Sequence, residues 1–288
     1  MYPTNGHSLY AVHTLPCRKS DSTLTSLVRQ LLINKSPYNP YKTRSNPLAR
    51  GPPLGSKQTC AEGLNMIDLG SYQLSIPVGS PPKTITTAQL VKGYDGKYFK
   101  SKSDSIVFWS PVTGTKTENA KYSRSELRET WSDGSLHNWV YPDADNYLNA
   151  KLEVDQVPSS GKIVIGQIHA YESTEPLLKV EYQYKEDTKT GDIVAKVRNR
   201  FDDDESKVYK IVEGVKLNQT FSYVIHLSKG GKLTVSVNDT DWSKRISETW
   251  RDKPLYFKAG VYTQDNTGYT SEGGKATFYN LDIDHNKS

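Results

Sequence analysis

Alternation of apolar and polar residues dominates the chain beyond residue 64 and predicts β-strands. Leu, Val and Tyr alternate with polar residues over 178–184, and the same period of two recurs over 221–227 and 233–237. Alternate side chains of a strand point to opposite faces of a sheet, so each segment predicts one buried and one exposed face. The Lys-Gly-Gly-Lys segment 229–232 predicts a hairpin, because glycine adopts the positive φ angles of tight turns. A closing strand is expected over 277–283.

Many short strands separated by turn residues are typical of a β-sandwich or jelly roll. No internal repeat and no helical pattern longer than two turns occurs after residue 64. Sandwiches often use more than about 200 residues in a single domain. We therefore predict one all-β domain over 63–288, a jelly-roll β-sandwich of two antiparallel sheets with a concave substrate groove.

Residues 1–62 form a segment of different composition. The first 60 positions hold eight basic residues and one acidic residue, so their net charge is +7, and the rest of the chain carries −2. Pro and Ser separate the basic residues, and one short helical pattern occurs over 24–32. We predict a disordered or processed leader, with no nucleic-acid or membrane partner. No apolar run approaches the roughly 20 residues of a membrane span or the roughly 7–15 of a signal-peptide core.

The two cysteines, Cys17 and Cys60, lie within this leader or at its edge. A disulfide between them would indicate an oxidising compartment, and two free thiols are equally compatible with the sequence. No C-x-x-C or H-E-x-x-H spacing occurs, so we predict no metal site and no cofactor. The acidic run 202–205 is predicted to be a solvated turn rather than a calcium loop.

Three short strings place polar side chains two positions apart, over 124–128, 167–169 and 256–264. On strands, the polar side chains of each string share one face, and the mostly apolar residues between them point into a core. The polar residues are Arg124, Glu126 and Arg128; Gln167 and His169; and Tyr256, Lys258, Tyr262 and Gln264. The cations and hydrogen-bond donors gathered on this face suit a polyanionic sugar.

Each string alone has an ordinary structural explanation. Arg124, Glu126 and Arg128 are compatible with a solvated cross-strand charge ladder, His169 with a hydrogen-bonded histidine, and Tyr262 with a half-buried strand aromatic. Their joint occurrence on predicted common faces favours a functional site over three independent structural features.

The three strings resemble the signature of the alginate lyases of polysaccharide lyase family 7. That signature reads R-[ST]-E-L-R, Q-[IV]-H and Y-F-K-A-G-x-Y-x-Q, in this order along a jelly-roll domain. The resemblance covers about residues 65–288, including Gly70-Ser-Tyr-Gln-Leu-Ser-Ile-Pro77 near the domain start. Thr263 stands where the family often has Asn, a departure that concerns substrate fit.

The resemblance implies an enzyme that cleaves the 4-O-glycosidic bonds of alginate by β-elimination, without metal or cofactor. Arg124 and Gln167 would neutralise the uronate carboxylate and stabilise the charge that develops on it. His169 and Tyr262 would act as base and acid. Glu126 would position Arg124 or Arg128 through an ion pair. The candidates for substrate binding are Glu126 itself, Arg128, Tyr256, Lys258 and Gln264.

Finer expectations accompany the resemblance. The enzyme would be a monomer that cleaves within the polymer, secreted or periplasmic because alginate is too large to enter cells intact. Nearby cations such as Arg124 and Lys258 would lower the pKa of Tyr262. Tyr262 would serve as both base and acid on mannuronate, whereas on guluronate His169 would take the proton. Ile168, in the middle of Q-[IV]-H, would favour activity on guluronate-containing blocks.

Two other functions compete with this interpretation. A jelly-roll glucanase would carry paired carboxylates, often as E-x-D-x-x-E on one strand. The nearest string, Glu153-Val-Asp155-Gln-Val-Pro158, lacks the second glutamate. A non-catalytic carbohydrate-binding module would keep aromatic platforms but would need neither His169 nor Tyr262.

Overall fold

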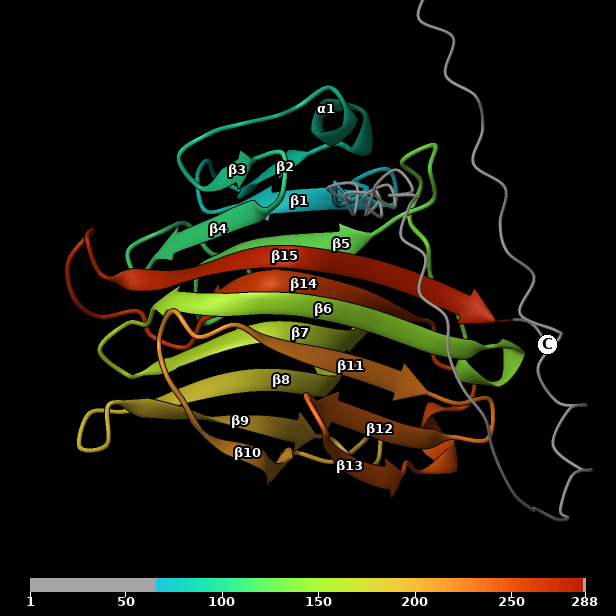
Figure 1. The fold of residues 1–288 in the computed structure, drawn as a ribbon. Coiled ribbons are helices and arrows are strands. Elements are labelled where there is room, and N and C mark those ends of the chain that lie inside the picture. Colours follow the sequence, from blue (N-terminus) through green and yellow to red (C-terminus); the bar gives the residue numbers. More distant parts are fainter. Residues whose placement is uncertain (1–65, 287–288) are drawn as a thin grey trace, which may run out of the picture. The chain divides into compact units, whose positions relative to one another are not determined.

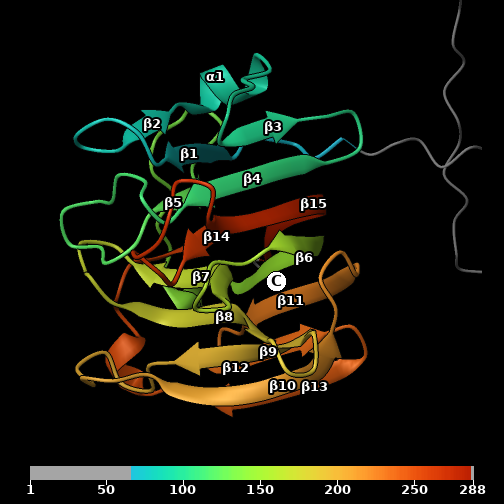
Figure 2. The same cartoon turned by 90° about the vertical axis from the view of Figure 1, so that its left-hand side faces the viewer.

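The computed structural model describes residues 66–286, which fold into two antiparallel β-sheets packed face to face (Figures 1 and 2). The eight-stranded sheet has the order β10-β9-β8-β7-β14-β5-β1-β2. Its strands are β1 Tyr72–Ile76, β2 Lys83–Ile85, β5 Arg124–Glu129, β7 Lys162–Ala170, β8 Pro176–Lys185, β9 Thr190–Val197, β10 Lys207–Val215 and β14 Leu255–Thr263.

The seven-stranded sheet has the order β13-β12-β11-β6-β15-β4-β3. Its strands are β3 Phe99–Ser101, β4 Ile106–Pro111, β6 Asp145–Gln156, β11 Phe221–Leu227, β12 Lys232–Val237, β13 Thr240–Arg245 and β15 Gly273–Asn286. The helical elements are one α-helix, α1 Thr87–Val91, and two 3-10 turns, η1 Tyr141–Asp143 and η2 Glu248–Trp250. The predicted jelly-roll β-sandwich is confirmed.

The alternation in the sequence corresponds to burial between the two sheets. In β8, Leu178, Val180 and Tyr182 are fully buried. Strands β11 and β12 pair as an antiparallel hairpin, and Gly231 in their turn has a φ of +75°. The predicted strand over 277–283 lies within β15. The core therefore forms where the sequence places its apolar faces.

A bulge in β14 shapes the strand that carries the third string. The register of β14 with β7 shifts between Ala259 and Tyr262, while its register with β5 stays regular. Gly260 lies in the shifted segment with a φ of +141°, and a Cβ there would lie 2.6 Å from the Ser125 carbonyl oxygen. Glycine is needed at this position because the backbone conformation and the close approach of β5 both exclude a side chain.

The predicted leader over 1–62, with Cys17 and Cys60, lies outside the described residues. Within residues 66–286, no helix has the length and apolar character needed to cross a membrane. The acidic run 202–205 lies in a segment of turns and bends, where Asp202 pairs with Arg200.

Candidate active site

A pocket opens on the eight-stranded sheet over β5, β14, β7 and β8. Six of the nine predicted site residues line it: Arg124, Gln167, His169, Tyr256, Lys258 and Tyr262. The residues between them point the other way, since Leu127, Ile168 and Phe257 are fully buried in the core. The alternation of the three strings thus brings their polar side chains to one site.

Glu126 lies beneath the pocket and holds three of its residues. Its Oε2 is 3.2 Å from Arg124 Nη1 and 2.5 Å from Lys258 Nζ, and its Oε1 accepts a hydrogen bond from Gln167 Nε2. Burial favours the neutral acid, but Lys258 and Arg124 outweigh it and hold the pKa of Glu126 below its usual range. The predicted ion pair of Glu126 forms with Arg124, not with Arg128. One buried carboxylate therefore fixes two cations and an amide.

The pKa of Lys258 is shifted by burial and by the neighbouring charges. Burial lowers its pKa most, Arg124 lowers it further, and the ion pair with Glu126 raises it, with a net result of about 8. The two cations therefore repel each other across a shared carboxylate. An additional anion in the pocket would relieve that repulsion.

His169 presents one free ring nitrogen to the pocket. Its Nδ1 lies 2.9 Å from the backbone oxygen of Ala170. A carbonyl oxygen only accepts hydrogen bonds, so Nδ1 carries the proton and Nε2 carries the lone pair. Burial, followed by Lys258, lowers the pKa of His169 to about 3. The ring is therefore neutral near pH 7 and able to accept a proton through Nε2.

Tyr262 lies beside a cation, but its pKa moves opposite to the prediction. The Arg124 guanidinium carbon is 4.0 Å from the centroid of the Tyr262 ring. Burial raises the pKa of Tyr262 more strongly than Arg124 lowers it, so the pKa is raised. The prediction of a lowered value was wrong because it counted nearby charge and left out the loss of solvent. Tyr262 is a protonated donor in this pocket.

Comparison with known proteins agrees with this geometry. A model of the alginate lyase family matches residues 67–285. This chain belongs to the alginate lyase family. A curated alginate lyase from Klebsiella pneumoniae is 32% identical over 279 residues, covering 76% of this chain and 89% of that protein.

Solved alginate lyases share the fold. An alginate lyase from Pseudomonas aeruginosa has a TM-score of 0.73 and 44% identity, over 76% of this chain and 99% of that one. Alginate lyase A1-II′, a member of polysaccharide lyase family 7, has a TM-score of 0.69 and 30% identity, over 77% and 97% of the two chains. The chain is therefore a polysaccharide lyase, and the predicted family is confirmed.

Three predicted substrate-binding residues lie outside the pocket lining of this lyase: Glu126, described above, Arg128 and Gln264. The Arg128 guanidinium carbon stacks 4.0 Å from the centroid of the Tyr256 ring, and Arg128 Nη2 donates to Asn138 Oδ1 at 2.6 Å. The Gln264 amide donates to the backbone oxygen of Thr263 at 2.6 Å. Their roles in substrate binding stay predictions. Tyr256 links Arg128 to the site, because its ring also stacks on His169 with 5.4 Å between centroids.

Thr263, the departure from the family pattern, points away from the pocket. Its side chain is fully buried, and its Oγ1 lies 3.0 Å from the Ser123 backbone oxygen. The threonine hydroxyl therefore binds the backbone beside Tyr262, and Thr263 does not line the pocket.

The pocket also contains residues that the sequence analysis did not single out. Lys179 of β8 lines it beside two loop segments, 117–120 and 173–174. Lys179 was detectable, because the alternation over 178–184 places it on the face opposite the buried leucine and valine. The loop residues carry no periodic signal, since their position depends on how the loops cross the sheet.

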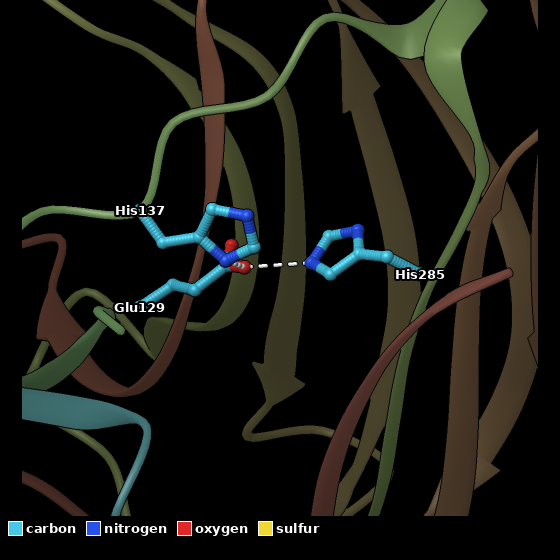
Figure 3. Close-up of side chains that lie close together, drawn as sticks. All are labelled: Glu129, His137 and His285. Atoms are coloured by element: carbon cyan, nitrogen blue, oxygen red, sulfur yellow. Dashed lines mark hydrogen bonds and ion pairs between the residues drawn. The ribbon is translucent and has the colours of Figure 1, made fainter. Parts of the chain in front are cut away.

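Among residues 66–286, one cluster combines histidine and carboxylate groups in the arrangement of a metal site. It consists of Glu129 at the end of β5, His137, and His285 of β15 (Figure 3). Glu129 Oε1 is 2.7 Å from both His137 Nδ1 and His285 Nε2, which are hydrogen-bond distances. Glu129 Oε2 accepts from the Trp139 indole at 2.9 Å and from the Phe257 backbone N–H at 3.0 Å.

Glu129 and the groups around it form a hydrogen-bond network that links the two sheets. Each carboxylate oxygen of Glu129 thus has two hydrogen-bonding partners. The other ring nitrogen of His285, Nδ1, lies 2.7 Å from Asn146 Oδ1. Burial raises the pKa of Glu129, but hydrogen bonds from His137 and His285 outweigh it and bring the pKa to about 2. Glu129 thus joins β5 and β14 of one sheet to β15 of the other.

Proposed function

We propose that this lyase cleaves the 4-O-glycosidic bonds of alginate within the polymer by β-elimination. The product would carry a double bond between C4 and C5 of the new non-reducing uronate. The observation that carries the proposal is the Glu126 cluster, which presents two cations and an amide beside a neutral histidine and a protonated tyrosine. These are the groups that proton removal next to a carboxylate requires.

Removal of the C5 proton is difficult because that carbon lies next to a carboxylate, so the intermediate would carry a second negative charge. Arg124 and Lys258 supply positive charge in a site largely shielded from water, where charge stabilisation is strongest. Arg124 Nε is buried and has no hydrogen-bond partner among the described residues. A substrate carboxylate bound beside Arg124 and Lys258 would relieve the repulsion between the two cations. Gln167 keeps a second amide hydrogen for the same group.

The proton transfers follow from the protonation states of His169, which is neutral, and Tyr262, which is protonated. In the proposed reaction, His169 Nε2 takes the proton from C5, the C5 electron pair forms the C4–C5 double bond, and the C4–O4 bond breaks. Tyr262 donates its hydroxyl proton to the departing O4. Binding of the substrate carboxylate offsets Lys258 and Arg124, so it raises the pKa of His169 and makes the ring a stronger base.

The protonation states of His169 and Tyr262 support a preference for guluronate-containing blocks. In guluronate the proton and the leaving oxygen lie on opposite sides of the ring, which suits a separate base and acid. On mannuronate Tyr262 would have to lose its own proton first, and its raised pKa opposes that step. Ile168 is fully buried, where one methylene changes packing by about 1 kcal/mol and shifts selectivity without excluding a substrate. A doubly substituted variant of alginate lyase A1-II′ has been crystallised with a substrate written GGMG.

The enzyme would act outside the cytoplasm, as a secreted or periplasmic protein, because the polymer does not enter cells intact. It would act as a monomer, since the proposed groups all come from one chain.

Elimination and hydrolysis are separated by one assay. The chain is incubated with alginate while both ultraviolet absorbance and reducing ends are recorded. Elimination predicts that both rise together, because the C4–C5 double bond is conjugated with the carboxylate. Reducing ends without absorbance would reject elimination, and a loss of activity in EDTA would reject a metal-independent reaction. A rapid fall in viscosity at low conversion is expected for cleavage within the chain.

A further inference from the structure

A row of four cationic side chains and one amide crosses five strands of the eight-stranded sheet. The strand register places Arg128 opposite Lys258, Lys258 opposite Gln167, and Gln167 opposite Lys179. Lys179 in turn lies opposite Lys196 of β9. Directly opposed residues of antiparallel strands point to the same face, and neighbouring strands lie about 4.8 Å apart. The row therefore continues the floor of the pocket beyond Gln167, towards β9.

Lys179 differs from the other two lysines of this row, which have carboxylate partners. Lys258 pairs with Glu126 at 2.5 Å, and Lys196 pairs with Glu181 at 3.6 Å. Among residues 66–286, no carboxylate lies within ion-pair distance of Lys179, and its Nζ lies 5.7 Å from the centroid of the Tyr262 ring. Lys179 therefore stands beside Tyr262 with no carboxylate of the described residues close enough to form an ion pair.

An unpaired ammonium in a partly buried position is unfavourable, because burial removes water that it would otherwise bind. Burial lowers the pKa of Lys179 most and Lys196 lowers it further, while Glu181 and Glu175 raise it without cancelling these effects. An anion supplied by a ligand would remove this penalty. In the proposed reaction the pocket receives a uronate carboxylate at Arg124, and a polyuronate has one carboxylate on every residue.

We propose that Lys179 binds the carboxylate of the uronate residue next to the one that reacts. A 1,4-linked pyranose is similar in length to the spacing between two strands, so a polymer lying across the strands brings successive residues over successive members of the row. Lys179 is then a specificity-determining residue that requires a charged neighbour on the β8 side of the cleaved bond. This inference rests on the proposed action on a polyuronate.

The test compares Lys179→Gln, Lys179→Arg and wild type on alginate oligosaccharides of increasing length. Lys179→Gln is expected to raise KM on long oligosaccharides by roughly 10- to 100-fold, the size of one charge-assisted hydrogen bond. Its effect on kcat should be much smaller, as for a contact made equally in the ground state and the transition state. Lys179→Arg should restore most of the affinity. Higher salt should raise the KM of wild type more steeply than that of Lys179→Gln.

A matched control is Lys151→Gln, which removes the same charge from an exposed position on β6 of the other sheet. It should keep the wild-type KM at every length and salt concentration. If Lys179→Gln loses kcat equally at all lengths and keeps its KM, Lys179 acts on Tyr262 and the inference is overturned. An unchanged KM in a variant that still eliminates also overturns it. If wild type produces no unsaturated uronate, the proposed function itself has failed, which is a different result.

Discussion

Lys258 and Glu126 form a buried ion pair, with 2.5 Å between Nζ and Oε2. The same carboxylate oxygen also receives Arg124 at 3.2 Å, so one anion balances two cations. This imbalance leaves the site net positive and ready for a substrate carboxylate.

Glu126→Gln should lower kcat by roughly 10²-fold or more, the usual cost of losing one preorganised electrostatic group. The amide keeps the shape of the side chain but leaves Arg124 and Lys258 without their shared counter-ion. Rates on alginate and circular dichroism spectra of both proteins check this. A folded variant with near wild-type kcat would show that the cations need no internal anion.

The alkaline limb of kcat/KM should fall near pH 8, because kcat/KM reports groups of the free enzyme and Lys258 loses its proton there. Arginine keeps its charge at that pH, so Lys258→Arg should keep its remaining activity to higher pH. Initial rates from pH 6 to 10 test this. The same limb in Lys258→Arg would assign it to another group.

His169→Ala should distinguish the two kinds of block. If His169 is the base for guluronate, cleavage of polyguluronate should fall by roughly 10²–10⁴-fold, and cleavage of polymannuronate far less. Separated blocks assayed by ultraviolet absorbance give the two rates. Equal losses would reject this division of roles, and a strong wild-type preference for polymannuronate would reject the inference from Ile168.

Glu129→Gln should reduce stability in a pH-dependent way. The pKa of Glu129 is about 2 in the folded protein, below its ordinary value near 4.5. The carboxylate therefore stabilises the fold by about 3 kcal/mol above pH 4.5, and this is lost as the pH falls towards 2. Urea unfolding at pH 7 and pH 3 should show the gap between wild type and variant narrowing. The exposed Asp204→Asn serves as control, and a gap that stays constant for Glu129→Gln would contradict the assigned role.

The strands and the polar face of the site follow from short-range alternation, because the side-chain period of a strand is two whatever the partners are. The alternation also places Lys179 on the polar face, but its proposed role depends on the cross-strand register, which the sequence does not give. Other features depend on tertiary packing. His285 lies 156 positions from Glu129, and nothing local predicts their contact. The raised pKa of Tyr262 depends on burial, which a list of nearby charges does not describe.

Tyr262→Phe tests the central claim most directly. The ring remains and only the proton donor is removed, so the variant should still bind alginate while turnover is lost. The measurement is the rate of ultraviolet absorbance gain on alginate, beside binding of the same polymer to both proteins. We predict bound polymer with no detectable formation of unsaturated product. Activity of about a tenth of wild type or more would contradict the assignment, given the usual size of general acid catalysis.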